Sequence, residues 1–449
     1  MNARLNAVVE ERIDDSYLDA IDVDILVESG KKTPEEIERD TPLFGVPLSV
    51  KECCMLKGMS YAVGCLNREE KRATDDGDVV RLLRKAGAIP MVVSNQPELC
   101  MSQETNNLIT GLTRNPYDQH RTVGGTSGGE AALVGSAASV IGIGSDIAGS
   151  LRCPAMFTGV FAHKPTAEVI SLRGHYPVAK DTNFDKYLTI GPIVRYAEDL
   201  PLMLNIMSGS ESKKLNLDKK VNVKSLKILY IEELENSFGL IPVENDIKDA
   251  IKKAINHFNA IGCDIKKADF EELSESPEIS TSVLFNLKGL PDVFNEIDDP
   301  KNKPNLFIEI LKSVFGLSMF SLSALTFNVM KNTNCFIPKS KTEHYSKLNE
   351  SLRSKLLNHL GDNGVFILPT FPTSAHYHNM HLVRNFGTVY VNMITALRLP
   401  CTQVPMGLNR KGLPIGFQVA AAPYQDRLCF AVAKELERKF GGWIQPPSL

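Results

Sequence analysis

The sequence predicts an α/β fold built around a mostly buried β-sheet. Of its 449 residues, 43% are hydrophobic and 23% are charged, which is typical of a globular enzyme with a large core. Segments with helical and strand-like patterns alternate along the chain, and no internal repeat or low-complexity linker interrupts them. The formal net charge is −3 and no basic cluster is present, which argues against a nucleic-acid partner.

The alternation begins near the N-terminus. Apolar residues at helical spacing predict one or two amphipathic helices within residues 3–30. Residues 48–51 predict a short buried strand that ends on a lysine, Lys51. Residues 78–87 predict a helix that is closed by a glycine, and residues 88–94 predict the buried strand that follows it.

The same pattern continues to the C-terminus. Residues 139–144 predict a short strand and 226–231 predict another. Residues 244–262 predict an amphipathic helix, 364–370 a strand and 425–440 a final helix. Strands separated by helices in this way favour a sheet whose faces are both covered.

One long segment lacks charge, from Ser313 to Met330. A membrane-spanning helix needs about 20 predominantly apolar residues, and this serine-containing run is of borderline length. We expect a buried or half-buried helical hairpin here rather than a span, or else an apolar surface that lines a substrate path or contacts a membrane. The charged N-terminal segment is not expected to be a signal peptide or an anchor.

The cysteines and histidines do not indicate redox or metal chemistry. There are nine cysteines and no C-x-x-C pair, so we interpret them as reduced, mostly buried thiols, with Cys53 and Cys54 in the core beside Lys51. His376, His378 and His381 have no carboxylate at ligand spacing, which favours a structural or surface role over a metal site. We expect no metal and no cofactor.

The segment from Gly124 to Ser150 is the strongest candidate for chemistry, because it contains two glycine- and serine-rich turns. It lacks the patterns of a P-loop and of a dinucleotide-binding turn. A third use is an oxyanion site made of successive backbone N–H groups in Asp146–Ser150, with Ser150 as nucleophile. A desolvated lysine can act as the base for such a serine, and Lys51, which ends an apolar strand, is suitably placed.

Three motifs resemble the amidase signature family: Pro42-Leu-x-Gly-Val-Pro-x-x-Val-Lys51, Gly124-Gly-x-Ser-Gly-Gly129 and Gly144-Ser-Asp-x-x-Gly-Ser-x-Arg-x-Pro-Ala155. Further matching stretches extend the resemblance over almost the whole chain. It implies one amidase domain over residues 1–449, with a large, mixed, twisted sheet covered by helices on both faces. Four other stretches are similar to the fatty-acid amide hydrolase branch of this family: Glu98–Met101, Val140–Gly142, Arg195–Leu200 and Phe440–Trp443.

The resemblance also implies a mechanism. Lys51 would be the general base, a hydroxyl residue held after a cis peptide bond would relay the proton, and Ser150 would attack the amide carbonyl. The oxyanion would be held by the backbone N–H groups of Ile147, Ala148, Gly149 and Ser150. Supporting roles would fall to Ser127, Asp146 and Arg152. We expect Glu98 and Asn95 to support Lys51 or the pocket.

Three features depart from the family pattern. Thr126 stands where the family has the bridging serine; it keeps the hydroxyl, but its β-branch narrows the choice of side-chain conformation. Ala148 stands where the family usually has glycine in the oxyanion turn. The chain also begins after the position of the hydrophobic anchor and first helices that the resemblance leads one to expect, so a truncated or soluble form is one interpretation.

The resemblance implies hydrolysis of lipid amides such as N-acylethanolamines or primary fatty amides. Alternatives are a general small-amide amidase, a glutamine-hydrolysing A-type component of a tRNA amidotransferase, and a weakly active or inactive relative because of Thr126. Residues 306–330 are expected to line the acyl channel and to touch a membrane surface on its cytoplasmic side. A homodimer is the expected assembly.

Overall fold

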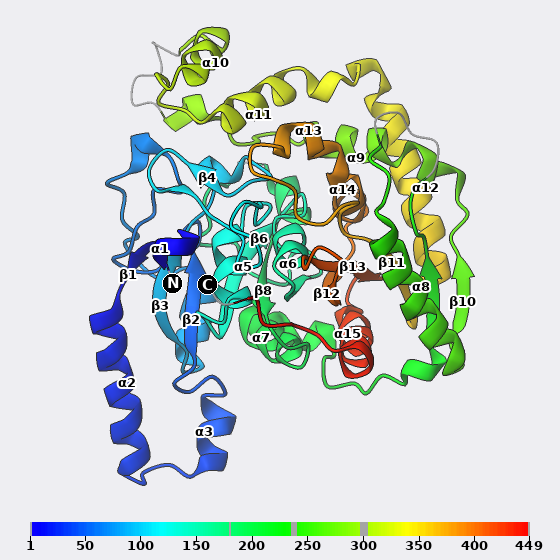
Figure 1. Ribbon diagram of the computed structural model, residues 1–449. Coiled ribbons are helices and arrows are strands. Elements are labelled where there is room, and N and C mark those ends of the chain that lie inside the picture. The colour runs from blue at the N-terminus through cyan, green and yellow to red at the C-terminus, as the bar shows by residue number, and fades with distance from the viewer. Residues whose placement is uncertain (1, 179–180, 235–239, 297–303, 448–449) are drawn as a thin grey trace.

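A computed structural model describes residues 2–178, 181–234, 240–296 and 304–447 of the chain. Its centre is an 11-stranded sheet with the order β1-β3-β2-β6-β8-β7-β12-β13-β11-β9-β10. Figure 1 shows this sheet running across the molecule, from β1, β2 and β3 on one side to β9 and β10 on the other. The sheet contains parallel and antiparallel pairs, which confirms the predicted mixed α/β fold.

The bounds of the elements are as follows. The strands of the large sheet are β1 (Val8–Glu11), β2 (Pro47–Lys51), β3 (Ile89–Ser94), β6 (Ile141–Asp146), β7 (Phe161–Lys164), β8 (Thr189–Val194), β9 (Lys227–Tyr230), β10 (Asp264–Lys267), β11 (Gly364–Pro369), β12 (Cys401–Leu408) and β13 (Pro414–Ala421). A separate pair is formed by β4 (Asn106–Asn107) and β5 (Gly111–Leu112). The helices are α1 (Asn2–Leu5), α2 (Ile13–Glu28), α3 (Pro34–Asp40), α4 (Asp78–Lys85), α5 (Gly128–Gly135), α6 (Arg152–Phe157), α7 (Asp199–Ser208), α8 (Asn245–Ala260), α9 (Ser276–Phe285), α10 (Leu306–Val314), α11 (Leu322–Asn332), α12 (Thr342–Leu360), α13 (His381–Arg384), α14 (Val389–Ala396) and α15 (Asp426–Phe440).

The order of the strands determines where the site can form. Strand β2 lies between β3 and β6 and is parallel to both of them. The carboxyl ends of β2 and β6 therefore meet at one edge of the sheet, which is where α/β proteins place their ligands. Lys51 ends β2 and Asp146 ends β6, so two distant sequence motifs become neighbours.

Helix α5 lies unusually close to the sheet. All eight of its residues are buried, and it packs against β2, β6 and β8. Its small side chains allow this approach: a Cβ at Gly129 would lie only 2.4 Å from the backbone oxygen of Asn95. Helix α6 packs beside α5, while α7 packs with α4 and α15 in a second group of helices against the sheet.

The N-terminal segment differs from the prediction. Of the one or two helices expected within residues 3–30, α2 covers the larger part (Figure 1). Val8–Glu11 instead form the edge strand β1, which pairs antiparallel with β3. The strand is so short that period-two alternation carries no usable signal, and pairing with β3 decides its conformation.

The charge-free segment forms part of a helical hairpin, α10 followed by α11, along the top of the molecule in Figure 1. A helical hairpin is therefore present, and of the two expectations for this region the exposed apolar surface describes α10 while the half-buried helix describes α11. Phe307, Leu311 and Phe315 are 78%, 61% and 70% exposed. Over the described residues, we find no helix with the length and apolar character that crossing a bilayer requires.

Candidate active site

Lys51 lies at the centre of the candidate site. Its side chain is fully buried at the end of β2, and its Nζ donates to Thr126 Oγ1 at 2.6 Å and to Ser145 Oγ at 3.2 Å. Thr126 belongs to the loop before α5, and Ser145 lies on β6 next to β2. The structure therefore brings the predicted lysine and threonine together. Ser145 was not predicted, although it stands within the third motif.

Burial acts to lower the pKa of Lys51, because an ammonium group loses its hydration in the interior. Negative charge on neighbouring thiols and on Asp146 acts the other way, and with the thiols ionised the pKa of Lys51 lies above its ordinary value. Burial raises the pKa of Cys53, and contact with Cys53 together with burial raises that of Cys100. Both thiols are therefore neutral at pH 7, so burial and the ionised Asp146 are the opposing influences that remain on the pKa of Lys51, and burial, the larger of the two, favours the neutral form.

Ser150 ends a tight turn that follows β6. Within this turn Gly149 has φ +91°, a conformation in which an L side chain is strained. A Cβ at Gly149 would also lie 2.5 Å from Val391 Cγ2, so glycine is needed there for space as well. Ala148 has no positive φ, so its methyl group is compatible with the turn. The backbone N–H of Ser127 donates to the carbonyl of Ser150 at 3.1 Å and holds the two loops together.

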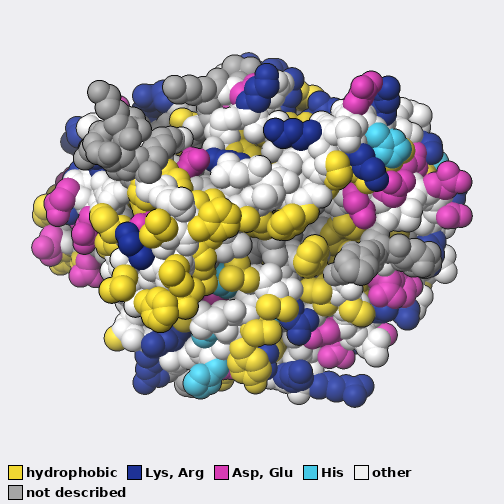
Figure 2. Space-filling model, turned by 90° about the horizontal axis from the view of Figure 1, so that it is seen from above, with side chains coloured by type: hydrophobic (Ala, Val, Ile, Leu, Met, Phe, Trp, Pro, Cys, Tyr) yellow, Lys and Arg dark blue, Asp and Glu magenta, His cyan; other side chains and the backbone are white. Residues whose placement is uncertain are grey.

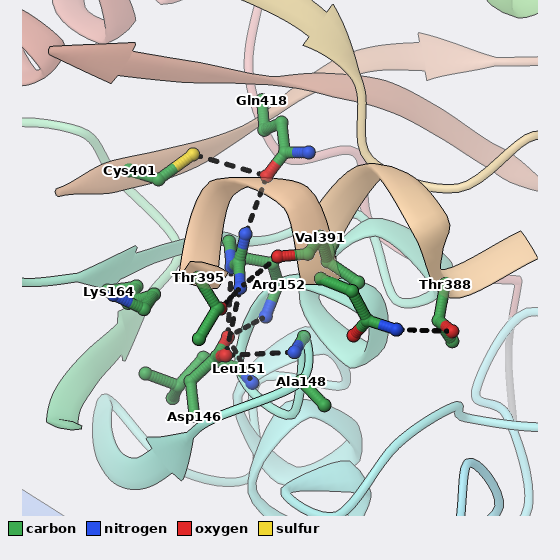
Figure 3. Close-up of polar contacts among 12 residues, drawn as sticks. Asp146, Ala148, Leu151, Arg152, Lys164, Thr388, Val391, Thr395, Cys401 and Gln418 are labelled. Atoms are coloured by element: carbon green, nitrogen blue, oxygen red, sulfur yellow. Dashed lines mark hydrogen bonds and ion pairs between the residues drawn. The ribbon is translucent and has the colours of Figure 1, made fainter. Parts of the chain in front are cut away.

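Asp146 fixes the turn from inside, as Figure 3 shows. Its carboxylate accepts hydrogen bonds from the backbone N–H groups of Gly149 and Leu151 and from the guanidinium of Arg152. Burial alone would raise the pKa of Asp146, but the charge and hydrogen bonds of Arg152 lower it to about 2. Asp146 is therefore ionised at every physiological pH.

Arg152 connects this turn to the second half of the sheet. Its guanidinium donates to Gln418 Oε1 on β13 at 2.9 Å and to Thr395 Oγ1 on α14 at 3.0 Å, and it is fully buried (Figure 3). A buried cation is stable only when its donors are satisfied, and here acceptors come from three separate segments. The supporting interactions predicted for Asp146 and Arg152 are thus present in the geometry, with Gln418 and Thr395 added.

Two expectations for the turn need correction. The N–H of Gly149 points to Asp146 Oδ1 at 2.8 Å, so it is already engaged. In the described part of the chain no hydrogen bond engages the N–H groups of Ile147, Ala148 and Ser150. The expected cis peptide before Thr126 is also absent: Tyr176–Pro177 is the one cis bond among the described residues. The ordinary trans bond already brings Thr126 Oγ1 within reach of Lys51.

A cavity of about 210 Å³ opens above the turn, and Thr126, Ala148 and Ser150 lie in its wall. No hydrogen bond joins Thr126 to Ser150 in the described residues, but both border this space. The remaining wall is largely apolar and comes from segments far apart in the sequence, including Met101, Phe184, Leu188, Leu284, Phe285, Leu290, Phe327, Met330 and Leu382. The cavity can therefore hold a long hydrocarbon group beside the hydroxyl of Ser150.

Seen from above, hydrophobic side chains gather over the face formed by the α10–α11 hairpin and α13 (Figure 2). Helix α11 contributes Phe327 and Met330 to the cavity wall, while α10 exposes Phe307 and Leu311 to the outside. One hairpin therefore borders both the cavity and the exposed apolar face.

Among the described residues, neither Glu98 nor Asn95 makes a hydrogen bond with Lys51. Glu98 accepts the backbone N–H of Ser321 at the start of α11, and burial raises its pKa to about 7. Asn95 donates to Thr113 and to a backbone carbonyl, so it braces a loop. Of the two expected roles, support of Lys51 or of the pocket, the contact of Glu98 with the start of α11 agrees with the second.

All nine cysteines are free, and Cys53 and Cys54 are buried beside Lys51 as expected. The histidine cluster has a partner that the sequence did not reveal: His378 and His381 both hydrogen bond to Glu104, at 3.1 and 2.9 Å. Glu104 is separated from them by more than 270 positions, so spacing could not identify it. Among the described residues, no group of three or more possible ligands is arranged to hold a metal ion.

Comparison with known proteins agrees with this geometry. The family described as Amidase matches residues 1–430. Fatty-acid amide hydrolase 2 from Homo sapiens is 38% identical over 99% of the chain and 84% of its own length. Fatty-acid amide hydrolase 2-B from Danio rerio is 36% identical over 99% and 85%.

A solved structure shares the fold. The structure described as fatty acid amide hydrolase superposes with a TM-score of 0.74 at 21% identity, covering 98% of this chain and 80% of its own. The family match over residues 1–430 and the relatives at 38% and 36% identity show that the chain belongs to the amidase signature family and is an amide-hydrolysing enzyme.

Proposed function

We propose that this enzyme hydrolyses fatty-acid amides, such as N-acylethanolamines or primary fatty amides, through an acyl-enzyme on Ser150. The observation that carries the proposal is the apolar cavity that ends at Ser150 and Thr126. An acyl chain would lie along its hydrocarbon wall, with the amide carbonyl beside the turn Ile147–Ser150. A polar substrate such as glutamine would leave that wall without partners.

In the proposed mechanism, neutral Lys51 accepts a proton from Thr126 Oγ1, which in turn accepts the proton of Ser150 as its oxygen attacks the carbonyl. The backbone N–H groups of Ile147, Ala148 and Ser150 stabilise the oxyanion, while Asp146 and Arg152 hold the turn in shape. Ser127 supports the same loop through its bond to the carbonyl of Ser150.

The second half of the reaction uses the same groups in reverse. The proton passes from Lys51 through Thr126 to the leaving nitrogen, which departs as the amine while the acyl group stays on Ser150. Water then attacks the acyl-enzyme, and its proton returns along the same path. Thr126 supplies one hydroxyl for both directions, so a substitution at that position affects acylation and deacylation alike.

A profile of turnover against acyl length tests the proposal. We expect kcat/KM to rise with chain length for a series of acyl amides, by roughly tenfold for two additional buried methylene groups. Higher activity on acetamide or glutamine than on long-chain amides would favour a small-amide amidase or an A-type amidotransferase component instead. No turnover of any amide, in folded protein that a fluorophosphonate fails to label at Ser150, would favour an inactive relative.

We further propose that the exposed apolar face of α10 rests on a membrane surface at its cytoplasmic side. Phe307, Ile308 and Leu311 would enter the interface, next to the cavity wall formed by α11. An amide dissolved in lipid would then reach the cavity without crossing water. A homodimer, which we also propose, is compatible with this orientation when the two hairpins face the same surface.

A further inference from the structure

A second hydroxyl–imidazole–carboxylate relay lies in the wall of the same cavity. Ser323 Oγ is 2.8 Å from His381 Nε2, and His381 Nδ1 is 2.9 Å from Glu104 Oε2. The three residues come from α11, α13 and the loop before β4, so the arrangement is made by the fold and not by one local turn. In this order of groups, a carboxylate orients an imidazole that can take a proton from a serine.

The protonation pattern follows from the partners. Burial alone would raise the pKa of Glu104, but hydrogen bonds from His378 and His381 lower it to about 2, so it is an acceptor only. The Nδ1 of His381 must therefore carry a proton and donate it to Glu104. In the neutral imidazole Nε2 is then an acceptor, and the hydroxyl of Ser323 donates to it. This is the tautomer that a general base requires.

His378 occupies the other oxygen of the same carboxylate. Its Nδ1 faces Glu104 Oε1 at 3.1 Å, and its Nε2 faces the backbone carbonyl of Gln119 at 3.0 Å. Both partners can accept a hydrogen bond, so His378 holds the second oxygen of Glu104 in place. The carboxylate that orients His381 is therefore itself fixed by a second imidazole.

The surroundings of Ser323 suit an acyl substrate. Ser323 and His381 both border the cavity, together with Thr326, Phe327 and Leu382. Ser323 is the second residue of α11, and in the described residues no hydrogen bond engages the backbone N–H groups of Leu322 and Ser323. Unengaged N–H groups in the first turn of a helix stabilise negative charge, as a carbonyl oxygen under attack requires.

From this geometry we infer that Ser323 is a second nucleophile, which hydrolyses long-chain acyl esters. The Ser323 oxygen bonds to the ester carbonyl carbon as its proton passes to His381 Nε2. The bond to the alcohol oxygen then breaks, and that oxygen takes the proton from His381. Water attacks the resulting acyl-serine, gives its proton to His381, and releases the fatty acid and the Ser323 hydroxyl.

Esters are the expected class for two reasons. An alcohol leaves more readily than an amine, and the two N–H groups at the start of α11 offer less stabilisation than the longer turn at Ser150. The apolar wall of the cavity selects a hydrocarbon chain, as it does for Ser150. The two serines would therefore share one acyl channel, with Ser323 restricted to the more reactive esters.

The test uses the full-length Ser150→Ala protein, which lacks the first nucleophile. A long-chain alkyl fluorophosphonate should form one adduct, which peptide mass spectrometry should locate at Ser323. The same protein should hydrolyse a long-chain p-nitrophenyl ester at least tenfold faster than the Ser150→Ala, Ser323→Ala double variant. Replacement of His381 by Gln in the Ser150→Ala background should remove the adduct.

Thr326 provides a matched control in the Ser150→Ala background. It is a hydroxyl residue on the same helix and in the same cavity wall, but its Oγ1 donates to the backbone of Leu322 rather than to a histidine. Thr326→Val should therefore keep the adduct. Folded Ser150→Ala protein without an adduct, or with an adduct at another residue, would overturn the inference. Amide turnover by the unsubstituted protein is measured separately. Failure of the inference about Ser323 can therefore be distinguished from failure of the proposed amidase function.

Discussion

Thr126 is the residue on which the proposed relay depends, because its hydroxyl receives the hydrogen bond of Lys51 at 2.6 Å. Thr126→Val keeps the shape of the side chain and removes the oxygen. We expect kcat on a long-chain acyl amide to fall by about 10²–10⁴, with KM changed little, since proton transfer by a positioned group contributes about that much. Steady-state kinetics at a pH near 8 measure the effect.

Thr126→Ser is the matched control, because it keeps the hydroxyl, removes only the methyl group and gives the serine that the family has at this position. We expect it to keep activity within about tenfold of the unsubstituted enzyme, in either direction. Full activity of the valine variant, in protein with an unchanged thermal unfolding midpoint, would show that another group carries the proton.

Substitution of Asp146 tests whether its carboxylate holds the turn before Ser150 in shape. Asp146→Asn leaves Arg152 without its carboxylate in a fully buried setting, where removal of one charge partner costs about 3–5 kcal/mol. We expect the free energy of unfolding, measured by urea titration, to drop by roughly this amount, and labelling of Ser150 to slow. An Asn variant that is as stable as the parent protein would contradict the role given to this pair.

Lys51 and Ser150 were singled out through motifs that resemble the amidase signature family, since a lysine after a buried strand is by itself more often a surface residue, and their catalytic roles stay predictions. Ser145 shares a motif with Ser150, yet its contact with Lys51 exists only because β2 and β6 are neighbours. Glu104 lies in no recognisable motif of the sequence. Pairings of that kind depend on tertiary packing, which short-range spacing does not encode.

At the scale of elements, the α10–α11 hairpin carries the proposed membrane contact. Phe307→Glu combined with Leu311→Glu places two carboxylates on the exposed face of α10. We expect binding to phosphatidylcholine–phosphatidylserine vesicles to weaken by tenfold or more, since two buried apolar side chains are lost and charge is introduced. Turnover of a detergent-free, short-chain amide should remain.

The matched control for this prediction is Leu18→Glu on α2, which is 60% exposed and lies at the opposite end of the molecule in Figure 1. It changes an exposed apolar residue without touching the hairpin, so vesicle binding should not change. Sedimentation with vesicles measures both variants. Equal binding by the hairpin variant and the unsubstituted protein would remove the membrane proposal and leave the amidase chemistry intact.

The sequence predicted elements with a clear apolar pattern better than the edge strand β1. Helices α8 and α15 and strands β9 and β11 lie within about two residues of their expected bounds, because their apolar periodicity extends over whole segments. Strand β1 was missed because four residues at a sheet edge are held by their partner strand. For the α10–α11 region the sequence left a buried hairpin and an exposed apolar surface both open, because hydrophobicity alone does not distinguish a buried face from an exposed one.

For the whole molecule, stability should depend on pH through two buried carboxyl groups. Burial raises the pKa of Glu98 and of Glu130 to about 7 in the folded protein, above the usual value of 4.5. Between these values the folded chain keeps protons that the unfolded chain releases. The contribution of these two groups to the free energy of unfolding should therefore fall as pH rises from about 4.5 to 7, while buried His175, whose pKa burial lowers to about 3, contributes in the opposite direction up to about pH 6.5.

Glu130→Gln isolates one of these contributions, because a neutral amide cannot ionise and still offers an oxygen to Ser49 Oγ. The stability of the variant relative to the parent should increase as pH rises from about 4.5 to 7, by about 1–3 kcal/mol in total. Chemical denaturation at pH 5, 6, 7 and 8 provides the comparison. Parallel curves for the two proteins would indicate that Glu130 is ionised throughout.

The site residues lie far apart in the sequence, and this separation has a consequence for how the enzyme folds. Lys51 must find partners 75 and 94 positions away, and Arg152 must find Gln418 at a distance of 266 positions. Contacts between residues that lie so far apart in the sequence form slowly, because a large loop must close, at a cost in chain entropy, before the contact can stabilise it. During synthesis, Ser150 leaves the ribosome long before β13 does. The newly made chain should therefore collapse and gain secondary structure well before it gains activity, and refolding followed by circular dichroism should run ahead of recovered amide turnover.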